Sequence, residues 1–494
     1  MVSSDRPFSP RLRWLLLAAL LAYAGLLGWN VGAYAGGADS SGYLNHARML
    51  AGGTVRTPTR DLPGAPAVEI SAFAYVPLGF SPASAGNPRE MVAIYPLGLP
   101  LLLALAGTLL GWTLAAPVTV VAHALAGLGV TYALGRAAGL HRRLALLGAA
   151  LLAVSPQYIF NAVQLLSDLP ALVWTTAAIL CAWKARTRPG WSWAAGLVFA
   201  LAVLIRPTNA LAAVPVLIAL GATWSRWWRM GLAGLPLALG LLWYNKAAYG
   251  HPLRFGYGEI GEAFGVGYVW PTLLHYALWL PVSLAVVGVL VLALPWAQSV
   301  ERPWKAVLLS WCMLLGVFYA LYPFTHQDWW ALRFVLPAFP AALVGALLVA
   351  QSWLAARSAA VQRKIVIATA VAGIAWGLVW CVPLRSWKIG RDEQVYVHAA
   401  TWARNHLPAG TVVFGAQTTG AMHYYTESVV VHWPFAHEPD ARKIVAAARG
   451  DGRQIYAFLF PEEEAMLSER PLPGRWVKEG WIRHVSVWKL VDAP

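Results

Sequence analysis

The sequence predicts a polytopic α-helical membrane protein that ends in a small α/β domain. Of its 494 residues, 59% are hydrophobic and only 12% are charged, whereas soluble domains carry about 25% charged residues. Apolar blocks recur along most of the chain, and its 27 Trp and 18 Tyr suit the aromatic belts that flank membrane spans. From about residue 386 the pattern changes to short strands that alternate with amphipathic helices.

Basic clusters between the apolar blocks predict the orientation. If each cluster is cytoplasmic, the N-terminus lies inside, and the first outer loop (34–92) and the chain after residue 385 lie outside. The prediction is about 11 spans, plus interfacial helices. A cleaved signal peptide is an alternative for the first block, because Ala33-Tyr34-Ala35 resembles a cleavage site. The basic residues used are Arg6, Arg11, Arg13, Arg136, Arg142, Arg143, Lys184, Arg186, Arg188, Arg226, Arg229, Arg302, Lys305, Arg357, Arg363 and Lys364.

Residues 95–112 and 114–135 are both apolar enough to enter the membrane, yet the clusters leave room for one full span. We expect 95–112, which begins with Pro96 and Pro100, to be re-entrant or partial. The net charge of +15 is interpreted as topogenic charge and contact with anionic lipids rather than as nucleic-acid binding. The three cysteines lie in apolar stretches and show no metal-ligand spacing, so no metal or other cofactor is indicated.

The segment 386–494 predicts an extracytoplasmic α/β domain of about 100 residues. It has no glycine-rich phosphate loop, which argues against nucleotide binding. Docking or guiding an acceptor and stabilising the outer face both remain open as its role. The expected helices are 391–407, 438–449 and one opening at 461, and the expected strands are 411–416, 429–433, 454–460 and 484–491.

Three polar positions fall at the ends of apolar blocks on the predicted outer face. Asp39 precedes apolar residues at helical spacing (43–50), a pattern typical of a short helix at the membrane interface. Asp39 would either cap this helix or act as a catalytic base. Asp168, two residues before Pro170, fits an N-cap and is also a candidate site residue. Arg206 could extend its charge to the headgroups or bind a phosphate.

Two later outer loops, 244–259 and 322–337, add cations interleaved with aromatic residues. Carboxylates and cations on one membrane face suit an enzyme whose substrate has an isoprenoid-like tail and a phosphate. A transporter also concentrates charges, but usually at the bilayer midplane. These loops contribute Lys246, His251, Arg254, His326, Asp328 and Arg333.

The ordered motifs resemble the GT-C superfamily of membrane glycosyltransferases, in particular protein O-mannosyltransferases and lipid A aminoarabinose transferases (glycosyltransferase family 39). The motifs are GADSSGYLNHARML (37–50), AIYPLGLPLLLAL (93–105), LLSDLPALVW (165–174), LIRPTNAL (204–211), GHPLRFGYG (250–258) and LRFVLPAFP (332–340). The segment 401–426 is similar to the outer domain of many bacterial members.

This resemblance implies a sugar donor carried on a polyprenyl phosphate and an acceptor that could be protein, lipid or polysaccharide. Asp39 matches the family's catalytic acid and would act as general base with inversion at the sugar carbon. Asp168 matches the acid of the second outer loop, which implies a second catalytic residue that supports acceptor binding or the base. Arg206 and Arg333 match basic positions near the donor and would contact its phosphate. Ser40 and Ser41 follow Asp39, which puts an adjacent acidic pair and its metal in doubt. The remaining expected substrate-binding residues are Lys246, Arg254, His326, Tyr43 and Tyr95.

Two other functions share this pattern. A flippase or transporter for lipid-linked glycans would move the headgroup across the bilayer without forming a glycosidic bond. A ligase or polymerase would use the same donor and transfer a whole glycan. The predicted location in all cases is a bacterial-type cytoplasmic membrane, with residues 1–385 as the transmembrane domain.

Overall fold

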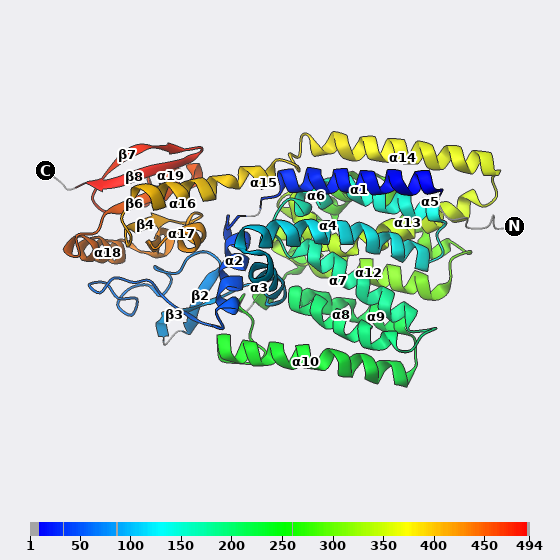
Figure 1. The fold of residues 1–494 in the computed structure, drawn as a ribbon, viewed down its shortest axis with the longest axis horizontal. Helices are drawn as coiled ribbons and strands as arrows, with labels where there is room; N and C mark the ends of the chain where they lie inside the picture. The colour runs from blue at the N-terminus through cyan, green and yellow to red at the C-terminus, as the bar shows by residue number, and fades with distance from the viewer. Residues whose placement is uncertain (1–8, 33, 85–86, 259, 492–494) are drawn as a thin grey trace. The chain divides into compact units, whose positions relative to one another are not determined.

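The computed structural model describes residues 9–32, 34–84, 87–258 and 260–491. Arg6 and Ala33, used above for orientation and for the cleavage site, lie outside these described residues. The chain divides into two compact units (Figure 1). The helical unit comprises Met1–Val31, Pro117–Gly240 and Glu259–Ile389, and the mixed unit comprises Gly32–Ala116, Leu241–Gly258 and Gly390–Pro494.

Helices account for most of the described chain. The first ten are α1 (Pro10–Asn30), α2 (Ala38–Ala51), α3 (Gly98–Leu110), α4 (Trp112–Ala137), α5 (Arg142–Ala153), α6 (Pro156–Ala162), α7 (Asp168–Lys184), α8 (Trp191–Ile205), α9 (Ala213–Leu220) and α10 (Trp224–Tyr249). They are followed by α11 (Val269–Ser283), α12 (Arg302–Ala320), α13 (Phe339–Leu354), α14 (Ala359–Cys381), α15 (Ile389–Asp392), α16 (Gln394–His406), α17 (Thr419–Tyr425), α18 (Glu438–Gly450) and α19 (Pro461–Met466).

Shorter elements complete the fold. The 3-10 helices are η1 (Pro207–Ala212), η2 (Ile260–Ala263), η3 (Val266–Tyr268), η4 (Val287–Trp296), η5 (Pro323–His326), η6 (Trp329–Ala338) and η7 (Trp433–Phe435). The strands are β1 (Thr57–Pro58), β2 (Phe80–Ser84), β3 (Asn87–Ala93), β4 (Val412–Gly415), β5 (Val429–His432), β6 (Ile455–Leu459), β7 (Arg475–Ile482) and β8 (Val485–Val491).

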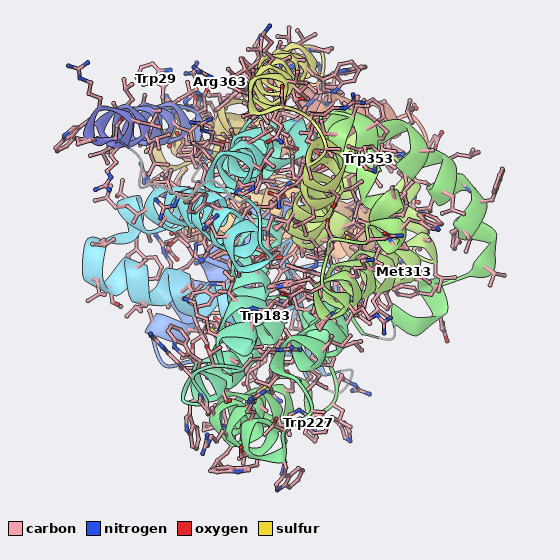
Figure 2. All side chains as sticks on the ribbon, turned by 90° about the vertical axis from the view of Figure 1, so that its right-hand side faces the viewer. Trp29, Trp183, Trp227, Met313, Trp353 and Arg363 are labelled. Atoms are coloured by element: carbon pink, nitrogen blue, oxygen red, sulfur yellow. The ribbon has the colours of Figure 1, made fainter. Side chains whose placement is uncertain are left out.

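The helical unit has one large apolar core, in which α7, α12 and α13 are central and Trp304 and Trp311 are buried. Figure 2 shows Trp183 toward the middle of this bundle, where its ring lies 4.0 Å from that of Trp304. Large apolar side chains also cover the outer surface of the bundle. Four of them, each exposed, are labelled in Figure 2: Trp29, Trp227, Met313 and Trp353. Such a surface suits contact with lipid rather than with water.

By length and composition, five described helices are suited to cross a membrane, or up to seven if two sharply bent pairs each form one span. The prediction of about 11 spans is therefore not confirmed, because several apolar blocks fold as shorter or bent helices. The bends are 65° between α5 and α6 and 112° where η4 follows α11. Helix α3 has only 13 residues, fewer than the roughly 20 that a span requires; partial insertion of 95–112 stays a prediction.

The mixed unit contains two sheets. A five-stranded sheet has the order β5-β4-β6-β8-β7, with β5, β4 and β6 parallel and β8 and β7 antiparallel. Its strands and helices lie where the alternating pattern of 386–494 predicts them, although the sequence did not predict α17 or the edge strand β7 (Figure 1). The first outer loop adds a second sheet, in the order β1-β3-β2.

Both faces of the five-stranded sheet are covered. On one face Val413 and Val430 pack against the apolar side of α16. On the other face, Val412 and Phe414 pack against α18 and against residues 62–75 of the first outer loop. The loop that carries Asp39 and the C-terminal sheet therefore form one hydrophobic unit, although the sequence predicted a boundary between them near residue 385.

Candidate functional site

Asp39 lies in the first turn of α2, one residue after Ala38. The N-cap of this helix is Gly37, whose φ of 33° favours glycine, and no side chain caps the helix. The alternative that Asp39 is an N-cap carboxylate is therefore wrong. Its charge at this position is favoured by the positive end of the helix dipole. Residues 40–47 are all buried inside the mixed unit, and the expected position of α2 at the membrane interface stays a prediction.

A hydrogen bond from the Tyr95 hydroxyl holds the Asp39 carboxylate. Burial, followed by the nearby charge of Asp39, raises the pKa of Tyr95 well above its usual value, so this phenol stays a donor. The Tyr43 ring lies 4.7 Å from that of Tyr95. A methyl group at Gly42 would lie 2.3 Å from Tyr95 Cε2, so only glycine leaves room for this ring. The expected residues Asp39, Tyr43 and Tyr95 are thus brought together.

The loop after α10 completes the surroundings of Tyr95. Tyr257 lies edge-on to Tyr95, with ring centroids 6.0 Å apart, and the Tyr249 hydroxyl donates to the carbonyl of Ala93 at 2.8 Å. The two cations expected from this region, Lys246 in the last turn of α10 and Arg254 in the loop, are exposed. No ion pair joins either of them to another residue in the described part of the chain.

The C-terminal segment also holds α2 from the side of α17. Asn45 donates to the carbonyl of Gly420 at 3.1 Å. Arg48 donates to the carbonyl of Tyr424 at 2.9 Å and lies 3.5 Å above the centre of its ring. A methyl group at Gly420 would collide with the Ser41 hydroxyl, so these two helices approach closely. The position of Asp39 therefore depends on the C-terminal segment.

A second carboxylate near Asp39 was not predicted. Glu393 is the N-cap residue of α16, and a methyl group at Gly36 would lie 3.5 Å from its Cβ. Burial, followed by the charge of Asp39, raises the pKa of Glu393 to about 8. In the sequence, this acid resembles any solvated residue at a helix start, and only the tertiary fold brings it to α2.

In the helical unit, Asp168 and Arg206 form a buried ion pair, with side chains 4% and 12% exposed. Asp168 is the first residue of α7, where it makes no capping hydrogen bond, so its predicted capping role is wrong. Arg206 ends α8, and its Nε donates to the Tyr319 hydroxyl at 3.3 Å. Thr208 is hydrogen-bonded to the same hydroxyl at 2.8 Å. The guanidinium is therefore fixed rather than extended toward headgroups.

Arg333 lies near this pair. The ring of Phe334 is 5.3 Å from the guanidinium carbon of Arg206 and 5.3 Å from that of Arg333. The two arginines thus share one aromatic neighbour, an arrangement that keeps two cations within one small region. His326 lies on η5, where it stacks on Tyr268 at 5.9 Å.

Comparison with known proteins identifies the architecture. The family model of dolichyl-phosphate-mannose-protein mannosyltransferases matches residues 119–247. The structure of ArnT from Cupriavidus metallidurans bound to undecaprenyl phosphate is similar over 97% of this chain and 99% of that one, with a TM-score of 0.59 and 15% identity. The chain has the GT-C fold. The resemblance expected from the sequence motifs is therefore confirmed, as is a polytopic helical membrane architecture.

Two archaeal structures share this GT-C fold. One is the oligosaccharyltransferase of Archaeoglobus fulgidus, tethered with an acceptor peptide containing the NVT sequon. The match covers 92% of this chain and 71% of that one, with 14% identity and a TM-score of 0.54. AglB from the same organism, in complex with an inhibitory peptide and a dolichol-phosphate, covers 94% and 72%, with 14% identity and a TM-score of 0.50. No curated protein matches the chain by sequence.

The family model covers only part of the candidate site residues, whereas the GT-C fold covers nearly the whole chain. The matched segment, 119–247, contains Asp168 and Arg206 but not Asp39. Asp39 and Asp168 belong to different compact units. Among the described residues, no three His, Cys, Asp or Glu side chains converge as metal ligands.

Proposed function

We propose that the chain is a glycosyltransferase that moves a sugar from a polyprenyl-phosphate donor to an acceptor at the extracytoplasmic face of a bacterial-type cytoplasmic membrane. The GT-C fold supports this proposal, together with the lipid phosphates bound in two of the similar structures, undecaprenyl phosphate and dolichol-phosphate. The apolar surface of the helical unit provides the surroundings that a polyprenyl tail requires. In this proposal the N-terminus lies inside and the mixed unit outside.

The observation that carries the chemistry is the carboxylate of Asp39, held by the Tyr95 hydroxyl at the start of a buried helix. In the proposed step, the acceptor oxygen attacks the anomeric carbon while the bond from that carbon to the phosphate oxygen breaks. The acceptor proton passes to Asp39, and the polyprenyl phosphate leaves with the bonding electron pair. Attack opposite the leaving group inverts the anomeric centre.

The leaving phosphate gains negative charge in this step, so cations near it would lower the barrier. Arg333 and Arg206 are the candidates, since both lie against Phe334. Asp168 offsets part of the charge of Arg206 and fixes its orientation, which suits a positioning role for this acid. Lys246 and Arg254 are exposed, and we propose them for contacts with anionic headgroups or with the donor.

The test is a transfer assay on Asp39→Asn. The full-length protein in detergent or liposomes is given polyprenyl-phosphate sugars and candidate acceptors, and mass spectrometry detects the glycosylated product. Asp39→Asn should abolish product formation while its thermal unfolding stays close to that of the wild type. Full activity in this variant would exclude Asp39 as the base. Movement of the lipid-linked sugar across liposomes without any product would instead indicate a flippase.

A further inference from the structure

Glu393 is a half-buried residue whose carboxylate has one oxygen inside the fold. Its Oε2 atom is buried and has no hydrogen-bond partner, and no ion pair joins Glu393 to a residue that the structure describes. A buried, ionised carboxylate without partners is strongly disfavoured. The acid therefore retains its proton at neutral pH, in keeping with its pKa of about 8, which burial and the charge of Asp39 raise.

The groups around Glu393 come from several elements. Asp39 approaches from α2, and the backbone N–H of Gly37 donates to the hydroxyl of Tyr396, which lies on the helix that begins at Glu393. Other polar or charged groups of this region include Tyr34 and Arg483, which both hydrogen-bond to Gln394. They also include Arg391 and Asp392, which directly precede Glu393, and Glu462 and Glu463, which raise the pKa of Tyr396 after burial and Glu393. Arg483 is thus bonded to the neighbouring amide, and Asp39 is the charge that acts on Glu393.

We propose that Glu393 is a positioning residue for the reaction: it keeps a proton beside Asp39, so that Asp39 is the single negative charge at the start of α2. This inference rests on the proposed function. The C-terminal segment would then supply a neutral acid next to the base, which leaves the negative charge on Asp39 alone. Glu393 forms and breaks no bond with substrate, and in the transfer step only Asp39 accepts the acceptor proton.

Ionisation of Glu393 would place a second negative charge beside Asp39. A donor that carries a phosphate would then meet two carboxylates instead of one, and like charges at short range oppose binding. Transfer should therefore decline as the pH rises through the pKa of Glu393. The substitution Glu393→Gln keeps the shape and neutrality of the protonated acid, so it should remove this decline.

The first test measures protonation without requiring activity. Infrared spectroscopy of the purified full chain would follow the carbonyl stretch of a protonated carboxylic acid, and the difference from Glu393→Gln assigns the band to Glu393. The band should disappear with a midpoint near pH 8. In Asp39→Asn, the loss of the neighbouring charge should lower that midpoint by about one pH unit. A Glu393 already ionised at pH 6.5, or a midpoint that Asp39→Asn leaves unchanged, would overturn the inference.

The second test measures kcat/KM for the donor against pH. The wild type should lose about tenfold between pH 7 and pH 9, while Glu393→Gln should stay within about threefold of wild type at pH 7 and show no alkaline loss. Glu463→Gln is a control, because Glu463 is a buried acid of the same unit that accepts backbone hydrogen bonds from Ala416, Gln417 and Phe460. That variant should lose stability and keep the alkaline decline.

The outcomes separate the two proposals. An alkaline decline that persists in Glu393→Gln would overturn the role of Glu393 while leaving the transferase intact. The infrared midpoint of Glu393 could shift in Asp39→Asn while the protein forms no product with any polyprenyl-phosphate sugar. That result would overturn the transferase but would establish the proton beside Asp39. Unfolding curves at pH 7 check that each variant is folded before either measurement.

Discussion

Breaking the buried pair between Asp168 and Arg206 should destabilise the helical unit strongly. Both side chains are almost fully removed from solvent, at 4% and 12% exposure. Replacing Asp168 by Asn leaves the Arg206 charge buried without its counter-ion, and the expected loss is about 3–5 kcal/mol. Arg206→Met strands the carboxylate instead and also removes the hydrogen bond to Tyr319, so its loss should be of the same size.

A double-mutant cycle isolates the interaction between the two charges. Asp168→Asn combined with Arg206→Met removes both charges, so the double variant should lose clearly less than the sum of the single losses, by about 2 kcal/mol or more. The assay is equilibrium unfolding in mixed micelles at constant protein and detergent concentration. Thr208→Val serves as a control, because it removes only a neutral hydrogen bond to Tyr319 and should cost about 1 kcal/mol.

Two results would refute this reasoning. Single variants within about 1 kcal/mol of the wild type would show that the charges are hydrated or otherwise compensated. Strictly additive losses would show that the pair contributes no coupling and that each side chain acts through other contacts.

Three further predictions concern the mixed unit. Gly42→Ala should displace the Tyr95 ring, which a methyl group would approach to 2.3 Å, and lower kcat at least tenfold; an unchanged kcat would contradict the close packing. Tyr95→Phe keeps the ring but removes the donor to Asp39, and should lower kcat about tenfold with little change in the KM of the donor. His46 is fully buried and bonded to Tyr244, and burial lowers its pKa to about 3. The unfolded state therefore binds more protons between pH 6.5 and 3, and stability falls as the pH is lowered through that range. His46→Gln should recover about 2 kcal/mol of this loss at pH 5, measured by thermal unfolding.

The sequence predicted much of the C-terminal sheet because its strands and helices have distinct periods. Strands β4, β5 and β6 are short apolar runs bounded by turn residues, and α18 has acids in its first turn. Edge strand β7 was not predicted because charged and apolar residues are mixed on its exposed face and its other residues are at most half-buried. The three-stranded sheet of the first outer loop was also missed, since each of its strands contains a proline.

The site shows what local pattern cannot supply. Sequence identified Asp39, Tyr43 and Tyr95, but Glu393 reaches Asp39 only through packing between segments far apart in the chain. For Asp168, pattern favoured a cap, because an acid shortly before proline at a helix start commonly is one. Asp168 instead pairs with Arg206. In an apolar interior, an ion pair with a buried guanidinium stabilises the fold more than a capping hydrogen bond at an exposed helix end does.

The arginines used to predict orientation also have a local structural role. Arg186 donates from Nε and Nη2 to the carbonyls of Ala219 and Ile218, each at 2.7 Å, and Arg226 donates to the carbonyl of Leu220 at 3.0 Å. These carbonyls end α9, where a helix leaves acceptors unsatisfied and carries partial negative charge. A charge count alone would treat lysine as equivalent at Arg186. The two hydrogen bonds require the planar guanidinium fork. The residue type at this position is therefore constrained both by the charge that orients the chain in the membrane and by the hydrogen bonds at the end of α9.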